Sequence, residues 1–187
     1  MSYQNLRPAV AACAAALVLS GCGGGSGSST PPDPIAGQNG AVGYQGAFAN
    51  VKSAPTDAPA VTGLAELVVG KSQTKVSVTA TGFDITAVYG AYVDTDTCSA
   101  ADPGGGHYKF NPSGPDASPN VMRVDLVFQE DSHGVKQKGV DGEKTFDGVA
   151  GPQAKSVVIY QTRKPRFHED DPNPPKIACA DLKPETS

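Results

Sequence analysis

Residues 90–115 hold most of the side chains that could do chemistry in this chain of 187 residues. Tyr92, Asp94 and Cys98 follow one another along a predicted strand end, and a run of three glycines then leads to His107. Carboxylate, imidazole and thiolate groups are the donors from which proteins build zinc and copper sites. The segment therefore has the outline of a metal-binding loop, and its function depends on whether enough ligands are present.

Histidine is scarce, because the chain has only His107, His133 and His168. His133 lies in DSHG, which is typical of a turn, and His168 begins the acidic run HEDD, which is typical of a solvated segment and at most a weak cation site. A structural zinc site needs four ligands and a catalytic one keeps three. A metal role for His107 would therefore need at least two further ligands beside it. The alternative is a solvated loop histidine.

The elements that must position these residues are β-strands. In KVSVTATGF the apolar Val76, Val78 and Ala80 alternate with polar residues, and VMRVDLVF (residues 121–128) predicts one strand with Met122, Val124, Leu126 and Phe128 on one face. GYQGAF, LAELVV and KSVVIYQT are further short β-type runs, and GKSQ (residues 70–73) predicts a hairpin turn. No segment of the domain predicts an amphipathic helix. We expect an antiparallel sandwich or flattened barrel with long loops.

The first residues direct the protein to its compartment. Arg7 precedes an apolar run, residues 9–19, that is too short to span a bilayer, and the following Leu19-Ser20-Gly21-Cys22 resembles the bacterial lipobox. We therefore expect a signal peptide over residues 1–21 and acylation of Cys22. The alternative is an ordinary secretory signal with an incidental cysteine.

Residues 22–40 form a Gly/Ser/Pro tract, which predicts a flexible tether between the lipid and a single domain over residues 41–187. Glycine follows Cys22, which resembles the outer-membrane sorting pattern. We expect a lipid-anchored protein of the bacterial cell envelope that faces the periplasm. The net charge of −4 provides no basic surface for nucleic acid.

Two cysteines remain in the domain, Cys98 and Cys179. In an oxidising envelope compartment an even pair of cysteines predicts one disulfide. The sequence has no Gly-x-Ser-x-Gly motif and no phosphate-binding loop.

The order of TGFDITAVYGAYV, TCSAADPGGGHY, VDL, SVVIY and KIAC resembles the bacterial periplasmic copper/zinc superoxide dismutases. The resemblance covers about residues 63–183 and implies a Greek-key β-barrel or sandwich of this length. Cys98 and Cys179 match the disulfide of that family, and Lys176 stands where its substrate-guiding arginine is expected.

The resemblance also places residues at the metal-ligand positions. Tyr92 and Asp94 stand at two copper histidines, Tyr160 at the last copper histidine and Met122 at a zinc histidine, while Asp125 matches the aspartate of the family's HxGDL segment. His107 matches the metal-bridging histidine, although a different gap would place Lys109 there. The paired site of the family uses six histidines and copper alone uses four, so most ligands are replaced.

Three hypotheses follow. The first is a lipid-anchored, superoxide-dismutase-like protein that has lost metal binding and catalysis and acts as a binding or structural module, with the membrane and an envelope protein as partners. The second is a metal-handling protein that keeps copper or zinc at His107, Asp125 and Asp94. The third is a divergent dismutase. The missing histidines favour the first hypothesis, which needs no cofactor and no enzymatic activity.

Overall fold

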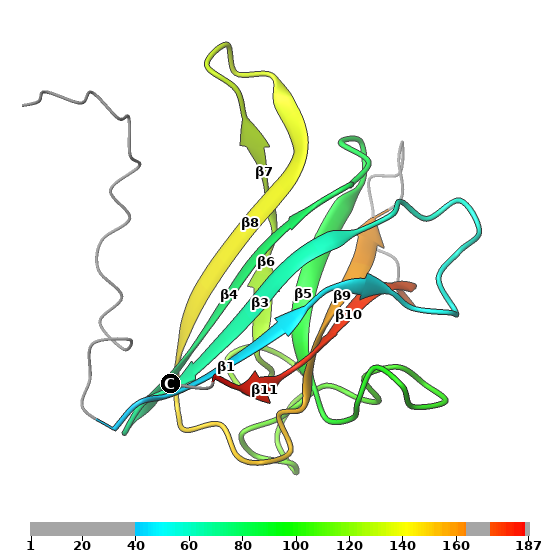
Figure 1. Cartoon of the computed structure of the whole chain (residues 1–187). Helices are drawn as coiled ribbons and strands as arrows, with labels where there is room; N and C mark the ends of the chain where they lie inside the picture. Colours follow the sequence, from blue (N-terminus) through cyan, green and yellow to red (C-terminus); the bar gives the residue numbers. More distant parts are fainter. Residues whose placement is uncertain (1–39, 164–172, 186–187) are drawn as a thin grey trace, which may run out of the picture. The chain divides into compact units, whose positions relative to one another are not determined.

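A computed structural model describes residues 40–163 and 173–185, in which every regular element is a β-strand (Figure 1). Cys22, the predicted signal peptide and most of the tether lie outside the described residues, as does His168. The described part of the chain contains no helix long and apolar enough to cross a membrane.

The strands form two antiparallel sheets. The first has the order β11-β1-β3-β4-β8-β7, and the second has the order β2-β10-β9-β5-β6. The bounds in the first sheet are β1 (Val42–Ala47), β3 (Thr62–Val69), β4 (Gln73–Thr81), β7 (Val127–Glu130), β8 (Lys136–Asp147) and β11 (Lys183–Pro184). Those in the second are β2 (Ala49–Asn50), β5 (Val88–Asp94), β6 (Arg123–Asp125), β9 (Ser156–Arg163) and β10 (Lys176–Asp181).

The predicted all-β class is confirmed, but the barrel alternative is wrong because the two sheets are not closed on each other. The four edge strands, β11, β7, β2 and β6, are two to four residues long. Apolar side chains from both sheets meet between them, among them Leu67 and Val78 from the first and Val93 and Ile159 from the second.

The first sheet follows the sequence patterns closely. Val76, Val78 and Ala80 of β4 are all buried, as their alternation predicts. The predicted hairpin turn is also confirmed, since the backbone N–H of Gly70 donates to the carbonyl of Gln73 at 2.8 Å between β3 and β4. One deviation is Lys75, which is buried and pairs with Glu143 of β8 at 2.6 Å.

The segment over residues 121–128 is not the single strand that its alternation predicts. It divides into β6 in the second sheet and β7 in the first, with buried Leu126 between them. Leu126 donates its backbone N–H to the carbonyl of Tyr89 in β5, whereas Val127 pairs with Asp141 in β8. The apolar face of this segment therefore points into one core while its backbone changes sheets.

The predicted disulfide between Cys98 and Cys179 is confirmed, with 5.6 Å between the Cα atoms. It joins the loop after β5 to β10 across 81 residues of sequence. Cys179 packs with Val51, Val158 and Tyr160 in a small apolar cluster apart from the main core. The bridge therefore fixes the long loop that carries His107 to the second sheet.

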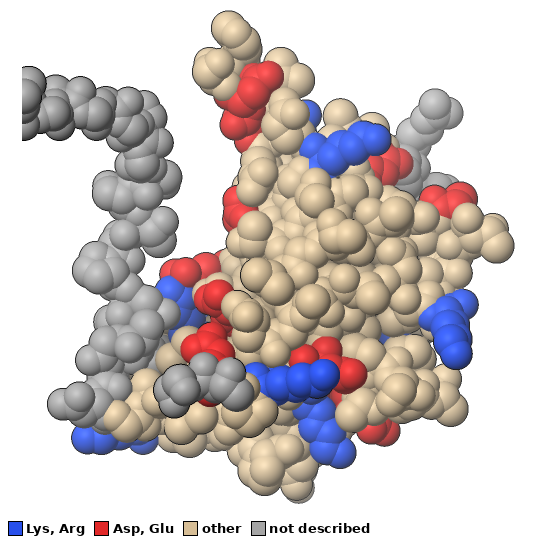
Figure 2. All heavy atoms as spheres, in the orientation of Figure 1, with Lys and Arg blue, Asp and Glu red and all other residues tan. Residues whose placement is uncertain are grey.

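Charged side chains are spread over the face in Figure 2, where acidic and basic groups are interspersed around a wide area without charge. The β7–β8 hairpin extends past the ends of its neighbouring strands (Figure 1), and its turn contains His133. The backbone N–H of His133 donates to the Asp131 carboxylate at 2.9 Å, so the prediction of a turn residue is confirmed.

Candidate functional site

Strands β5 and β9 lie side by side in the second sheet and position three of the candidate residues. Tyr92 and Asp94 are two residues apart in β5, so their side chains lie on the same face of the sheet. Tyr160 of β9 pairs with Gly90, which places it on that face as well. The glycine loop then returns to β5, where His107 forms a β-bridge with Asp94.

The Asp94 carboxylate is the centre of this group. Its side chain is completely buried, and both of its oxygens are engaged. Nδ1 of His107 lies 2.9 Å from Oδ1, and the Tyr160 hydroxyl donates to Oδ2 at 2.8 Å. A proton on Nδ1 lets the His107 ring donate to this carboxylate.

Burial dominates the electrostatics here. It raises the pKa of the Asp94 carboxyl above its ordinary value, although the hydrogen bonds from His107 and Tyr160 act in the opposite direction. The pKa of the Tyr160 phenol is raised strongly, first by burial and then by the neighbouring Asp94 charge. Tyr160 therefore stays protonated and donates its hydrogen bond at any physiological pH.

Aromatic rings enclose the carboxylate. The Tyr92 ring stacks on His107 with 4.1 Å between centroids and 12° between planes. The Tyr160 ring meets both of them edge-on, at 5.2 Å from Tyr92 and 5.3 Å from His107. We refer to Tyr92, Asp94, His107 and Tyr160 as the Asp94 cluster, in which side chains of the protein itself occupy the space around the carboxylate.

Lys176 holds the glycine loop in place from β10. Its ammonium lies 2.6 Å from the Asp102 carboxylate and donates to the Gly105 carbonyl at 2.8 Å. At Gly104 the backbone has φ of 79°, and a Cβ there would lie 2.9 Å from Oδ2 of Asp94. Glycine is needed at this position because the loop passes directly over the Asp94 cluster.

The other candidate ligands lie elsewhere. Asp125 projects to solvent with a side chain that is 74% exposed, and it pairs with Arg123 at 2.9 Å. Met122 is fully buried in the main core, and Lys109 faces Asp116 at 3.8 Å. Within residues 40–163 and 173–185, no group of three or more His, Cys, Asp or Glu side chains is placed so that it could hold a metal ion.

Neither a protein-family model nor a curated protein matches this sequence.

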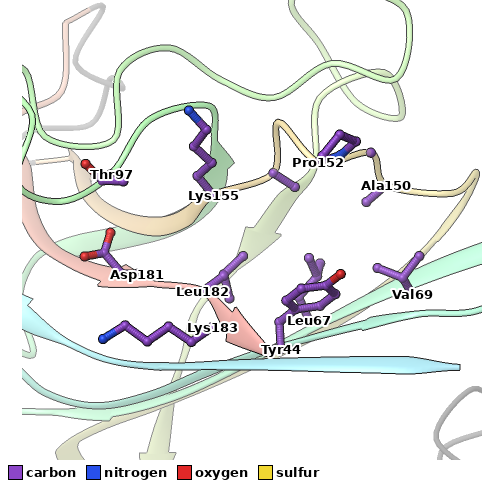
Figure 3. A pocket seen from close by; sticks show the side chains of 12 residues that line it. Tyr44, Leu67, Val69, Thr97, Ala150, Pro152, Lys155, Asp181, Leu182 and Lys183 are labelled. Atoms are coloured by element: carbon purple, nitrogen blue, oxygen red, sulfur yellow. The ribbon is translucent and has the colours of Figure 1, made fainter. Parts of the chain in front are cut away.

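A second candidate region was missed by sequence reasoning. A cavity of about 530 Å³ lies beside β1 and the end of β10 (Figure 3). Its wall combines residues from β1, β3, β10 and β11 with two loops, so residues more than 130 positions apart in the sequence meet there. No local motif reveals such a wall. We refer to this cavity as the β1 cavity.

Proposed function

We propose that this protein is a lipid-anchored binding or structural module of the bacterial cell envelope. It has the fold type of the copper/zinc superoxide dismutases but neither their metals nor their activity. The observation that carries the proposal is the Asp94 cluster. The residues that stand at three copper-histidine positions and at the bridging position lie together, and they satisfy one another's hydrogen bonds.

Strand order supports the fold part of the proposal. β1, β3 and β4 follow one another in the first sheet, the chain crosses to β5 in the second, and β8 returns to pair with β4. Connections that leave a sheet and return to it are typical of Greek-key sandwiches. The disulfide from the loop after β5 to the last long strand also matches the one that the resemblance implies.

The donor set does not fit a dismutase copper ion. Copper that cycles between two oxidation states needs several imidazoles in a geometry that both states accept, and the cluster supplies only His107. A phenol binds metal well only after losing its proton, and the raised pKa of Tyr160 makes that loss still less favourable. Asp94 is already occupied by two hydrogen bonds.

Metal analysis tests this proposal. The full-length protein, purified from cells grown with added copper and zinc, should contain far less than one equivalent of either metal. It should also not dismutate superoxide faster than free buffer metal does. Stoichiometric copper together with chelator-sensitive dismutase activity would show that the active site has been retained. The variant Tyr92→His/Asp94→His/Tyr160→His serves as a positive control, because it restores imidazoles beside His107.

The same measurement addresses metal handling. One equivalent of zinc that disappears in His107→Ala would support a residual site and contradict the proposal. Asp125→Ala is the matched control, because the Asp125 carboxylate pairs with Arg123 in solvent and its removal leaves the Asp94 cluster intact.

The anchor is tested separately. Wild-type protein should partition into the detergent phase, whereas Cys22→Ser should not. Cys13→Ser lies inside the apolar run and should behave as wild type. Equal partitioning of the wild type and Cys22→Ser would remove the lipid anchor from the proposal.

A further inference from the structure

The hydroxyl of Tyr160 differs from those of the other buried tyrosines in the described residues, because a proton acceptor lies beside it. It donates at 2.8 Å to Oδ2 of the Asp94 carboxylate, and both residues are buried. The Tyr108 hydroxyl instead accepts the backbone N–H of Gly151 at 2.9 Å. Among the described residues, the buried Tyr89 hydroxyl has no hydrogen-bond acceptor. Tyr160 is thus the buried tyrosine that has a carboxylate in position to take its proton.

A carboxylate at this distance matters for oxidation. A phenol that loses one electron becomes a strong acid, so its proton must leave at the same time or a positive charge remains in the protein interior. Asp94 supplies the acceptor at Oδ2. Burial raises the pKa of the Asp94 carboxyl, which makes it a stronger base than an exposed carboxylate. The pair is therefore arranged for the coupled loss of an electron and a proton.

Aromatic rings connect Tyr160 with the surface. It lies on β9, which runs beside β5 and Tyr92 in the second sheet (Figure 1). The Tyr160 ring is 5.2 Å from Tyr92 and 5.3 Å from His107 between centroids, and these two rings stack on each other at 4.1 Å. The His107 side chain is 28% exposed, and Tyr92 is also partly exposed. An oxidant in solvent thus reaches the edge of the ring stack, one ring away from Tyr160.

Other electron donors are scarce in this protein. The chain has no tryptophan. Cys98 and Cys179 are joined in a disulfide, so neither offers a thiolate, and Met122 is fully buried in the main core. Tyrosine is therefore the side chain of the described residues that a one-electron oxidant oxidises most readily.

We propose that Tyr160 is a redox-active tyrosine that gives one electron to a small inorganic radical in solvent. The electron leaves through the Tyr92 and His107 rings and reduces the radical to its anion, while the phenolic proton moves to Oδ2 of Asp94. The products are a neutral tyrosyl radical, a protonated carboxyl group and the reduced oxidant, so atoms and charge balance. This activity goes beyond the proposed function, because it needs neither an anchor nor a metal.

Pulse radiolysis tests the inference. Full-length protein is treated with a chelator and oxidised with azide radicals, and freeze-quenched samples are examined by electron paramagnetic resonance. We expect a tyrosyl radical that is coupled to one exchangeable proton, namely the proton transferred to Asp94, and this proton coupling is lost in D₂O. The radical should also form more slowly in D₂O, because the proton moves together with the electron. A tyrosyl radical without the exchangeable coupling, or no tyrosyl radical, would overturn the inference.

Variants locate the radical. Tyr160→Phe and Asp94→Asn should each lower the yield of the proton-coupled radical by about tenfold or more, because one lacks the phenol and the other the proton acceptor. Tyr108→Phe and Asp125→Asn are the matched controls for a buried tyrosine and an aspartate, and they should change the yield by less than about twofold. Wild-type yield in folded Tyr160→Phe would refute the assignment. If either variant of the pair fails to fold, the wild-type spectrum decides.

Metal content is measured on the same preparations before chelation, which separates the two proposals. Metal-free wild-type protein that forms no proton-coupled radical would overturn this inference and leave the proposed function standing. Protein that held stoichiometric copper and still forms the radical after chelation would overturn the metal-free proposal and support the assignment of Tyr160.

Discussion

The Asp94 cluster and the β1 cavity are close in the backbone, because the N–H of Lys155 donates to the carbonyl of Asp94 at 3.0 Å. Their side chains are organised in opposite ways. In the cluster a fully buried carboxylate has donors on both oxygens and rings around it. The wall of the cavity instead has exposed charged residues, and its side chains leave an open space.

This difference determines how much each region contributes to stability. A buried polar group that is fully paired contributes to the fold, and removing one partner leaves the other unsatisfied in a medium of low dielectric constant. Exposed ammonium groups, such as those of Lys155 and Lys183, contribute little to the fold. We therefore expect substitutions in the cluster to lower stability and substitutions of the exposed lysines in the cavity wall to leave it almost unchanged.

The disulfide connects the two regions and should give the largest effect. Cys179 packs against Tyr160 of the cluster, and the N–H of Cys98 donates to Asp181 of the cavity. Loss of a bridge that spans 81 residues should lower the free energy of unfolding by about 4 kcal/mol in the double variant Cys98→Ser/Cys179→Ser. Chemical denaturation measures this, with Ser99→Ala as control. Peptide mapping that found both thiols free in the wild type would refute the premise.

The pH dependence of stability should depend on Asp94. Because burial raises its pKa, the folded protein keeps the proton at pH values where the unfolded chain has lost it. The unfolding free energy should therefore fall as pH rises from the ordinary value of 3.8 towards the raised one, by up to about 1.4 kcal/mol per pH unit.

Asp94→Asn should lack this contribution, since the amide does not ionise, whereas Asp125→Asn at an exposed position should retain it. Denaturation curves of the three proteins between pH 4 and 8 provide the comparison. Parallel pH profiles for wild type and Asp94→Asn would show that the carboxylate is not the titrating group.

Removal of the Tyr160 hydroxyl should have a smaller effect. Tyr160→Phe keeps the ring contacts but leaves Oδ2 of Asp94 without its donor, which should cost about 2 kcal/mol. Tyr44→Phe in the cavity wall is the control and should change stability by less than about 0.5 kcal/mol. Thermal and urea denaturation of both variants would distinguish the two regions. Equal effects would contradict the distinction.

The smallest effect on stability is expected in the cavity. Lys155→Glu/Lys183→Glu should change the unfolding free energy by less than about 0.5 kcal/mol, because both side chains are exposed. The measurement is urea denaturation. A loss of several kcal/mol would mean that these lysines support the fold, and the contrast between the two regions would fail.

Sequence patterns predicted the parts of the fold in which one face is buried and the other is solvated. Alternation located β4, and the turn residues located its hairpin with β3. β8 was missed although it is the longest strand, because KQKGVDGEKTFD has few apolar residues and buries only Gly139, Val140 and Phe146. Its position is determined by pairing with β4 and β7, which no local pattern encodes.

For the candidate site, too, sequence reasoning was right for some residues and wrong for others. The resemblance in residue order placed Tyr92, Asp94 and Tyr160 together at metal-ligand positions. The structure brings these three side chains into contact because β5 and β9 pair directly. Asp125 was grouped with them from a motif, yet it follows buried Val124 in β6 and faces solvent. The β1 cavity could not be predicted, because its wall is assembled from separate segments and appears only after folding.

The open edges of the two sheets have a consequence for self-association. Exposed edge strands offer unpaired backbone groups to other chains, which is a common route to aggregation. Here each edge is at most four residues long, and β7 also carries a register irregularity between Phe128 and Glu130. An incoming strand would find too few consecutive donors and acceptors to add on. We therefore expect little strand pairing between the sheet edges of separate molecules.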